Sequence, residues 1–170
     1  MISSIELRDV FDKHAGRLVL IARSIGEPAE DAVQEAFIAL ASETPPPDDP
    51  FAWLVRVTRN RLLQWYRSDQ RRKRREQRSE TRAWFSGEVT LVDRQLDAML
   101  VTQSLQELDR QQRETIVMHL WGEMTFDQIS AATDVSRATA HRHYIRGLDQ
   151  LRVRFGLAAN ICHHPSRVST

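Results

Sequence analysis

The chain has 170 residues, a formal net charge of +1, 41% hydrophobic residues and only six glycines. This length allows one domain or two small ones, and the composition favours folded helical structure over a fibrous or disordered chain. A single cysteine, Cys162, excludes an internal disulfide and fits the reducing cytoplasm, where we expect the protein. The first residues lack the pattern of a signal peptide, and no apolar run is long enough to cross a bilayer, so we expect no membrane partner.

The positive charge is concentrated in one block. Residues 67–82 hold eight Lys or Arg against three acidic residues, whereas residues 1–66 and 83–170 are slightly acidic. A basic block between two acidic halves suggests a polyanionic partner that is met at one place. A solvated basic linker explains this feature equally well.

Three helices are expected in the first half of the chain. Ser3 and Glu6 have the spacing of a capping box, so the first helix begins there and runs to the Gly-Glu-Pro at 26–28. A second helix follows from about Pro28, and residues 44–50 are expected to form a stiff extended loop because four of them are proline. The buried face of the second helix is expected to hold Val33, Ala36, Phe37, Leu40 and Ala41.

The third helix is expected to run from Phe51 into the basic block and to carry two stripes. Its core stripe consists of Leu54, Val57, Thr58, Leu62 and Trp65. Beside it lies a polar stripe, in which one aromatic ring and four hydrogen-bonding side chains recur every three or four residues: Trp53, Arg56, Asn60, Gln64 and Arg67. Arg61 falls near the core stripe, where it is expected to snorkel from the packed face.

Helical periodicity fades between residues 70 and 90, which predicts a domain boundary. A further helix is expected from Leu91 to Leu105, and three short helical segments follow it. Capping residues are expected at the start of each segment: Asp109 with Gln112, Thr125 with Gln128, and Ser136. The first segment should stop at Gly122, and the inner face of the last should hold Ala140, Tyr144, Leu148, Leu151 and Phe155.

A very short capped helix, a tight turn and a longer capped helix are typical of a helix-turn-helix. The N-terminal end of the second helix of this motif enters the major groove, where Arg can bridge guanine O6 and N7. The residues that we expect to contact DNA form a reading face: Arg137, Thr139, His141, Arg142 and Arg146. The alternative is a three-helix bundle whose basic face only keeps it soluble.

Three segments resemble the extracytoplasmic-function (ECF) sigma factors, a bacterial family. PAEDAVQEAFIAL (28–40) is similar to the segment that binds the clamp helices of RNA polymerase, and FAWLVRVTRNRLLQWYRSDQRR (51–72) to the promoter-melting helix with its usual W-L-x-x-I-A-R-N. Residues 108–152 resemble the domain that reads the −35 element. The resemblance implies an all-α protein of two small helical domains joined by a flexible linker, the C-terminal one a helix-turn-helix. The implied boundaries are 1–72 for a region 2-like domain, 73–95 for the linker, 96–157 for a region 4-like domain and 158–170 for a tail.

The resemblance also implies partners and sites. Core RNA polymerase would be bound through its β′ clamp helices and β flap, with Asp31, Gln34 and Glu35 as clamp contacts. The loop at 44–50 and the polar stripe would read the −10 promoter element and hold an extruded base, and the reading face would contact the −35 element. An anti-sigma factor is a further possible partner, and no cofactor or metal is implied. His141, Arg142 and His143 replace a usual Arg/Lys-Ser-Arg run, so a different −35 preference is expected.

Two other functions stay open at this stage. A stand-alone helix-turn-helix regulator would use residues 1–82 for dimerisation or sensing. A metal-dependent nuclease would need Asp31, Glu35, Asp48 and Asp49, but two of these lie on a helix and two in a loop, and nothing beside them activates a nucleophile. Cys162, His163 and His164 are adjacent ligands without a second cluster, which favours an ordinary tail over a metal site. We therefore expect no enzyme.

Overall fold

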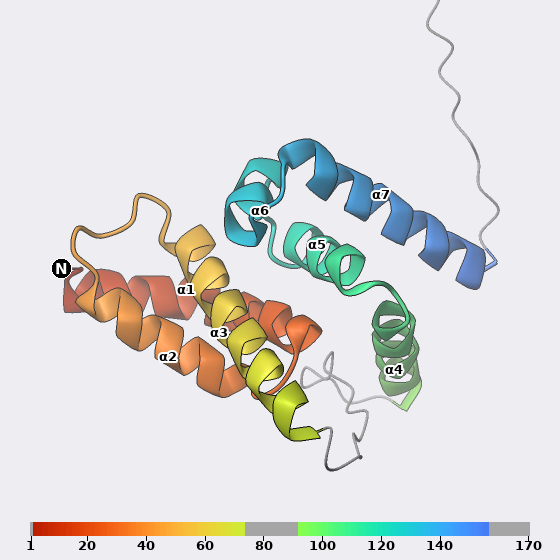
Figure 1. The fold of residues 1–170 in the computed structure, drawn as a ribbon, viewed down its shortest axis with the longest axis horizontal. Coiled ribbons are helices and arrows are strands. Elements are labelled where there is room, and N and C mark those ends of the chain that lie inside the picture. The colour runs from red at the N-terminus through yellow and green to blue at the C-terminus, as the bar shows by residue number, and fades with distance from the viewer. Residues whose placement is uncertain (1, 74–91, 157–170) are drawn as a thin grey trace, which may run out of the picture.

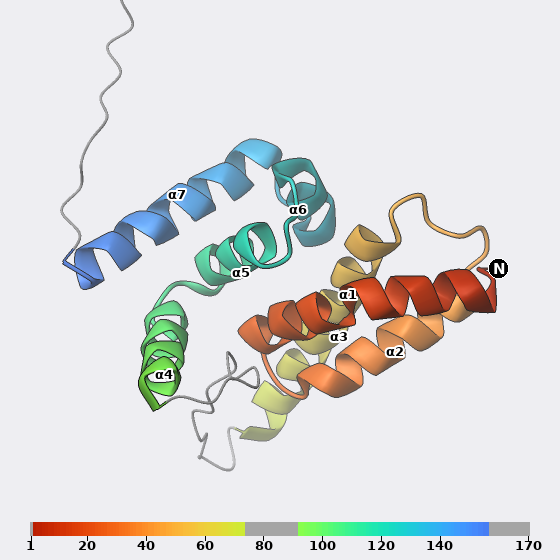
Figure 2. The same cartoon turned by 180° about the vertical axis from the view of Figure 1, so that it is seen from behind.

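The computed structural model describes residues 2–73 and 92–156, which form seven α-helices and no strand (Figure 1). The helices form two groups, α1 to α3 and α4 to α7, that lie side by side in both views (Figure 2). The predicted all-α fold is confirmed. Of the linker expected at 73–95, residues 74–91 lie outside the described residues. The whole tail expected at 158–170, including Cys162, His163 and His164, also lies outside them.

The first group is a bundle of α1 (Ser4–Ile25), α2 (Ala29–Ser42) and α3 (Pro50–Lys73), in which each helix packs against the other two. The predicted capping box starts α1: Ser3 Oγ accepts a hydrogen bond from the Glu6 amide at 3.2 Å, and Glu6 Oε2 accepts one from the Ser3 amide at 2.9 Å. The loop before α3 is one residue shorter than predicted. Asp49 Oδ1 accepts a hydrogen bond from the Ala52 amide at 2.9 Å, so Pro50 is already helical.

The core of this bundle follows the predicted stripes. Val33, Ala36, Phe37 and Leu40 of α2 are buried, as are Leu54, Thr58 and Leu62 of α3, whereas Ala41, Val57 and Trp65 are half-buried. Two further α3 residues, Val55 and Arg59, are also buried, although they lie outside the predicted core stripe. Arg59 is covered where the second group of helices packs against α3, because it pairs with Glu114 of that group.

The second group comprises α4 (Val92–Gln106), α5 (Arg110–Leu120), α6 (Phe126–Thr133) and α7 (Arg137–Arg154). The predicted caps of the helix-turn-helix are present, with a full capping box between Thr125 and Gln128 and with Ser136 Oγ accepting from the Thr139 amide at 3.2 Å. α5 packs against both α6 and α7, and its buried side chains close the core of this group.

Two predictions for this group are wrong. Asp109 precedes α5, but its side chain makes no cap hydrogen bond, and Gln112, the expected partner in a capping box, is buried in the core. Phe155 was expected on the inner face of α7, but it forms the C-cap of that helix and is 47% exposed. The error at Phe155 comes from extending a helical pattern to a helix end, where the backbone leaves the regular register.

The two groups share one core. α1 packs against α5 and α3 packs against α6, and the buried apolar side chains of both groups form a single cluster. At Gly122 a Cβ atom would lie 2.9 Å from Ile21 Cδ1 of α1 and 2.4 Å from the Met118 carbonyl oxygen, so only glycine fits there. We call this interface between the two groups the seam.

The described residues offer neither a membrane span nor a metal cluster. None of their helices is long and apolar enough to cross a bilayer. No group of three or more His, Cys, Asp or Glu side chains among them is arranged to hold a metal ion.

Candidate nucleic-acid interface

The polar stripe lies along one flank of α3. Arg56, Asn60, Gln64 and Arg67 are exposed, and Trp53 is half-buried against the core. Spacings of three and four residues along a regular helix place these side chains in one row. The row offers guanidinium donors, two amides and a ring edge to a partner, and it stays open although the neighbouring Val55 and Arg59 are buried.

The predicted polymerase contacts lie on α2. Asp31 and Gln34 are exposed, whereas Glu35 is half-buried and its Oε2 lies 2.5 Å from Arg61 Nε of α3. Arg61, expected to snorkel from the packed face, also lies over the ring of Trp65, with its guanidinium carbon 6.0 Å from the ring centroid. Glu35, one of the three predicted polymerase contacts, is therefore already paired with Arg61.

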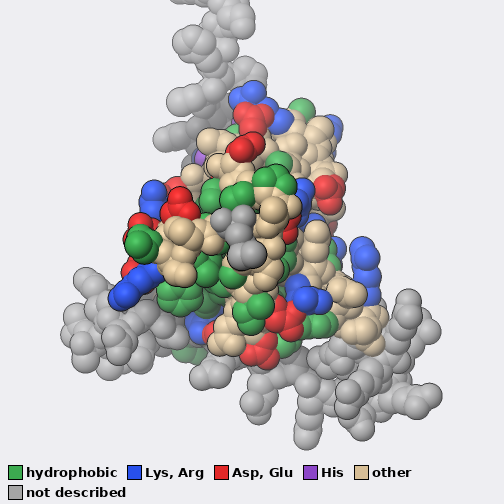
Figure 3. All heavy atoms as spheres, turned by 90° about the vertical axis from the view of Figure 1, so that its left-hand side faces the viewer, with side chains coloured by type: hydrophobic (Ala, Val, Ile, Leu, Met, Phe, Trp, Pro, Cys, Tyr) green, Lys and Arg blue, Asp and Glu red, His purple; other side chains and the backbone are tan. Residues whose placement is uncertain are grey.

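The end of the molecule where α1 begins carries hydrophobic side chains on its surface (Figure 3). Ile5 is 76% exposed and Phe11 51% exposed, and the ring of Phe11 leans on Phe37 of α2 with centroids 5.0 Å apart. No role was predicted for these side chains from the sequence.

The reading face occupies the N-terminal half of α7. Arg137, His141, Arg142 and Arg146 are exposed and Thr139 is half-buried, whereas Ala140 and Gly147 are buried on the opposite side. A hollow of about 620 Å³ lies between Phe126 of α6 and four residues of α7: Arg137, Ala138, His141 and Arg142. Four of the five predicted residues are therefore exposed, and three of them, Arg137, His141 and Arg142, line the same hollow.

Local contacts orient this face. Arg142 Nη2 donates a hydrogen bond to Thr139 Oγ1 at 3.0 Å, and Arg137 Nε lies 3.6 Å from Asp127 Oδ1. The His141 ring meets Phe126 edge-on, with centroids 5.2 Å apart. Arg146 makes no ion pair with any residue that the structure describes, so its guanidinium is available to a partner.

A cluster of rings behind the reading face was not predicted. His119 of α5 stacks on Phe126 of α6 at 4.6 Å, and Tyr144 of α7 meets both edge-on. His119 Nδ1 lies 2.8 Å from the Met124 carbonyl oxygen, so this nitrogen carries the proton and donates it. The cluster joins the three helices, and of its members only Tyr144 was expected on an inner face.

Polar groups also cross the seam. Arg59 Nε lies 2.8 Å from Glu114 Oε2, and both side chains are buried, with 9% and 1% exposed. Arg113 Nε donates to the Ser24 carbonyl oxygen at 2.7 Å. Neither Arg59 nor Glu114 carried a predicted role, because their pairing joins positions 55 residues apart in the chain.

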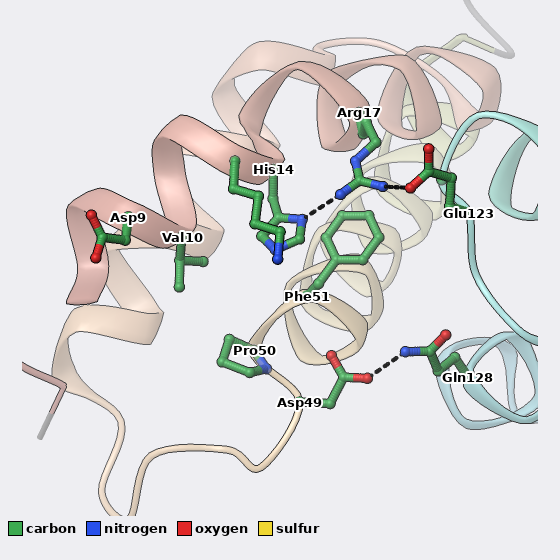
Figure 4. A pocket seen from close by; sticks show the side chains of 11 residues that line it. Asp9, Val10, His14, Arg17, Asp49, Pro50, Phe51, Glu123 and Gln128 are labelled. Carbon is green, nitrogen blue, oxygen red and sulfur yellow. Dashed lines mark hydrogen bonds and ion pairs between the residues drawn. The ribbon is translucent and has the colours of Figure 1, made fainter.

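The far end of the seam encloses a pocket of about 550 Å³ between α1, the start of α3 and the loop after α5 (Figure 4). Arg17 Nη1 lies 2.5 Å from Glu123 Oε2 on one side, and Gln128 Nε2 donates to Asp49 Oδ2 at 2.6 Å on the other. Between them, His14 stacks on Phe51 with centroids 4.6 Å apart. Burial, followed by the nearby Arg17 and Lys13 charges, lowers the pKa of His14.

Comparison with known proteins identifies both groups of helices. Residues 10–72 match the family model for sigma-70 region 2, and residues 98–151 match that for sigma-70 region 4. Together these matches cover about two thirds of the chain. A search of curated proteins finds no match.

Two solved structures share the fold. CnrH in complex with the cytosolic domain of CnrY has a TM-score of 0.64 at 24% identity, over 92% of this chain and 92% of that chain. The sigma factor RpoE in complex with the anti-sigma factor NepR, from Bartonella quintana, has a TM-score of 0.66 at 20% identity, over 91% of this chain and 96% of that chain.

The order of the matches along the chain repeats the order of the structure. Region 2 covers the α1–α3 bundle with its open polar stripe, and region 4 covers the helix-turn-helix with its open reading face. The resemblance noted from the sequence is thereby confirmed, and the chain belongs to the sigma-70 family of transcription initiation factors.

Proposed function

We propose that the protein is a sigma factor of the ECF type in which residues 1–72 open the −10 element and residues 96–157 read the −35 element, with residues 73–95 as the linker. Membership of the sigma-70 family makes it a factor that directs core RNA polymerase to promoters. Sigma factors are in general regulators without enzymatic activity. We place the protein in the cytoplasm, where its polymerase works.

The observation that carries this proposal is the pair of exposed polar surfaces on two separate helices, one on α3 and one on α7. An exposed amide on α3 can read a base edge, and the half-buried Trp53 can stack on an unpaired base. The basic side chains of α7 can contact guanine and phosphate in a major groove. Two surfaces of different chemistry suit an element that is melted and an element that stays double-stranded.

The proposed polymerase contacts are Asp31, Gln34 and Glu35 of α2, toward the β′ clamp helices, with region 4 toward the β flap. An anti-sigma factor is a further proposed partner, supported by the RpoE–NepR complex, whose fold this chain shares. A stand-alone operator-binding regulator is not favoured, because the region 2 match gives the first half of the chain a role at polymerase.

The test is reconstituted transcription. The purified chain is added to core polymerase on a library of genomic fragments, and RNA 5′ ends are sequenced, with polymerase alone as the control. We expect starts that share two upstream elements and depend on the chain, together with weak duplex binding by the chain alone. Tight sequence-specific DNA binding without polymerase, and no chain-dependent starts, would establish the regulator instead.

A further inference from the structure

We propose that the hollow beside the reading face reads the C5-methyl group of a pyrimidine in the −35 element, and that Phe126 and Ala138 contact this methyl group. Thymine is the ordinary source of the group, and 5-methylcytosine carries the same one. The inference rests on the proposed function, because it takes the reading face to lie in a major groove. It starts from an apolar surface within a face that is otherwise basic.

The hollow opens between the first turn of α6 and the first two turns of α7. Phe126 and Ala138 give it an apolar surface, and its other lining residues are Arg137, His141 and Arg142. Ala138 is exposed and Phe126 is half-buried, so both can be reached from solvent. The hollow therefore offers a partner apolar contact and positive charge at the same place.

The ring of Phe126 is held in one orientation by three other rings. His119 stacks on it with centroids 4.6 Å apart, and Tyr144 and His141 meet it edge-on at 5.6 and 5.2 Å. Part of the ring nevertheless lines the hollow. A side chain that is already fixed loses little conformational entropy when a ligand binds, so this part of the ring is a preorganised contact surface.

The apolar surface continues along α7. Ile145 is an exposed large hydrophobic residue, and it lies seven residues after Ala138, which is two helical turns and therefore the same side of the helix. It also lies three residues after Arg142 and four after His141, so these side chains are neighbours on the helix surface. The exposed side of α7 thus alternates basic and apolar side chains.

The charges around the hollow favour the edge of a base over a phosphate group. Arg137 Nε lies 3.6 Å from Asp127 Oδ1, and this exposed carboxylate offsets one of the two arginine charges and would repel a phosphate. Arg142 is oriented by its hydrogen bond to Thr139 Oγ1 at 3.0 Å. A site built for phosphate alone would place neither a carboxylate nor an aromatic ring beside its arginines.

The chemistry of the major groove identifies the apolar group. The C5-methyl group of thymine is the apolar feature that base pairs present there, and Ala and Phe are among the side chains that contact it. Arginine in the same groove can bridge O6 and N7 of guanine. Phe126 and Ala138 can therefore contact a methyl group while Arg142 contacts the polar edge of a neighbouring base.

The first test is transcription by the full-length chain and core polymerase from promoters whose −35 thymines are replaced one at a time by deoxyuridine. This change removes the methyl group and leaves every hydrogen-bonding atom of the base in place. Burial of one methyl group changes an affinity about fourfold, so one such replacement should lower transcription about fourfold at a limiting concentration of the chain.

A second set of templates distinguishes the two sources of the methyl group. In these templates the −35 cytosines are replaced one at a time by 5-methylcytosine. A loss with deoxyuridine alone assigns the site to thymine, and an increase with 5-methylcytosine alone assigns it to 5-methylcytosine. Equal transcription from all substituted and unsubstituted templates would overturn the proposal.

Ala138→Gly connects the methyl effect to the hollow. It removes one apolar contact at an exposed position, so the effect of the base substitution should fall from about fourfold to about twofold or less, because the two changes delete the same interaction. Phe126→Leu, with its fold checked by circular dichroism, should reduce the effect from the α6 side.

Ala131→Gly is the matched control, because Ala131 is also an exposed alanine in a helix but does not line the hollow. It should leave the methyl effect at about fourfold. A full effect in both Ala138→Gly and Phe126→Leu would overturn the assignment of these residues.

The outcomes also separate this inference from the proposed function. Chain-dependent transcription without any methyl effect would support the function and overturn the inference. If the chain starts no transcription, the same base substitutions are measured by fluorescence anisotropy on duplexes that the chain itself selects from a random library. A methyl effect there, lost in Ala138→Gly and kept in Ala131→Gly, would uphold the readout site while refuting the function, and its absence would overturn both.

Discussion

Arg142 and Arg146 lie one helical turn apart on the exposed side of α7, opposite Ala140 and Gly147. If they contact bases, replacing either with Ala should cost about 1–3 kcal/mol and relax the preference at particular −35 positions. The measurement is transcription from a library of −35 variants with each mutant.

Arg152→Ala is the matched control, because Arg152 is an exposed arginine in the last turn of the same helix and pairs with Asp149. It should weaken transcription evenly across the library or leave it unchanged. Identical profiles for Arg142→Ala and Arg152→Ala would reduce α7 to a generic basic surface.

Asn60 offers a clean test of the polar stripe because its side chain is exposed on α3. Asn60→Ala should impair promoter opening, seen as lost permanganate reactivity near −10, while polymerase association stays intact. Trp53→Ala should act in the same direction, but it also removes packing because Trp53 is half-buried.

Gln111→Ala serves as the control, since Gln111 is an exposed amide on α5 far from the polar stripe in sequence. Normal opening by Asn60→Ala, or equal loss in both variants, would remove the stripe from −10 recognition.

His14 predicts a pH dependence of stability. Its pKa is lowered in the folded chain by burial, with smaller contributions from Arg17 and Lys13 against an opposing one from Asp49. The unfolded chain therefore binds the proton more readily, and the contribution of His14 to stability is present above the ordinary histidine pKa of about 6.5 and is lost as pH falls below it. Thermal unfolding from pH 7.5 to pH 5 should show a smaller loss for His14→Gln than for wild type; equal losses would assign the effect to other groups.

Among the helices, the start of α7 is the element on which the reading face depends. Ser136 Oγ accepts the Thr139 amide at 3.2 Å, and Thr139 in turn receives the hydrogen bond of Arg142. Ser136→Ala should lower the free energy of unfolding by about 1 kcal/mol. It should also weaken −35 readout, because the first turn of α7 frays.

The control is Ser42→Ala, at the end of α2, where the hydroxyl makes only a 3.4 Å contact with the Ile38 carbonyl oxygen. Urea unfolding followed by circular dichroism measures both variants. A loss in Ser42→Ala equal to that in Ser136→Ala would mean that the cap adds nothing specific.

Helix starts were predictable wherever the capping side chain accepts a hydrogen bond from a backbone amide three residues later. The boxes at Ser3 and Thr125 and the cap at Ser136 are local in sequence, and all three are present. Asp109 makes no such hydrogen bond, and the Gln112 side chain that a capping box needs is buried in the core. A local pattern decides a helix end only when tertiary packing makes no stronger demand on the same residues.

The same limit applies to the site. The polar stripe and the reading face follow from helical periodicity, and the structure leaves both open, as expected from the sequence. Their roles at −10 and −35 stay predictions. The Arg59–Glu114 pair and the His119 cluster join residues from different helices, and periodicity within one helix carries no information about such contacts.

At the scale of the whole molecule, the main difference from the sequence interpretation is the seam. The sequence predicts two small helical domains joined by a flexible linker and no contact between them, whereas the described residues of both groups contribute to one buried apolar cluster. Association of this kind makes the stability of each group depend on the other, so unfolding of α5 is expected to expose Arg59 of α3 as well.

The side chains of α3 fall into three rows. One row faces the bundle core, one faces the seam, and the third is the exposed polar stripe. α7 has only a packed side and a free side. The number of positions that can be substituted to retarget the protein to new promoters therefore differs between the two helices. Substitutions in the two buried rows of α3 are expected to disturb packing, whereas the exposed positions of α7 can be varied with the scaffold left whole.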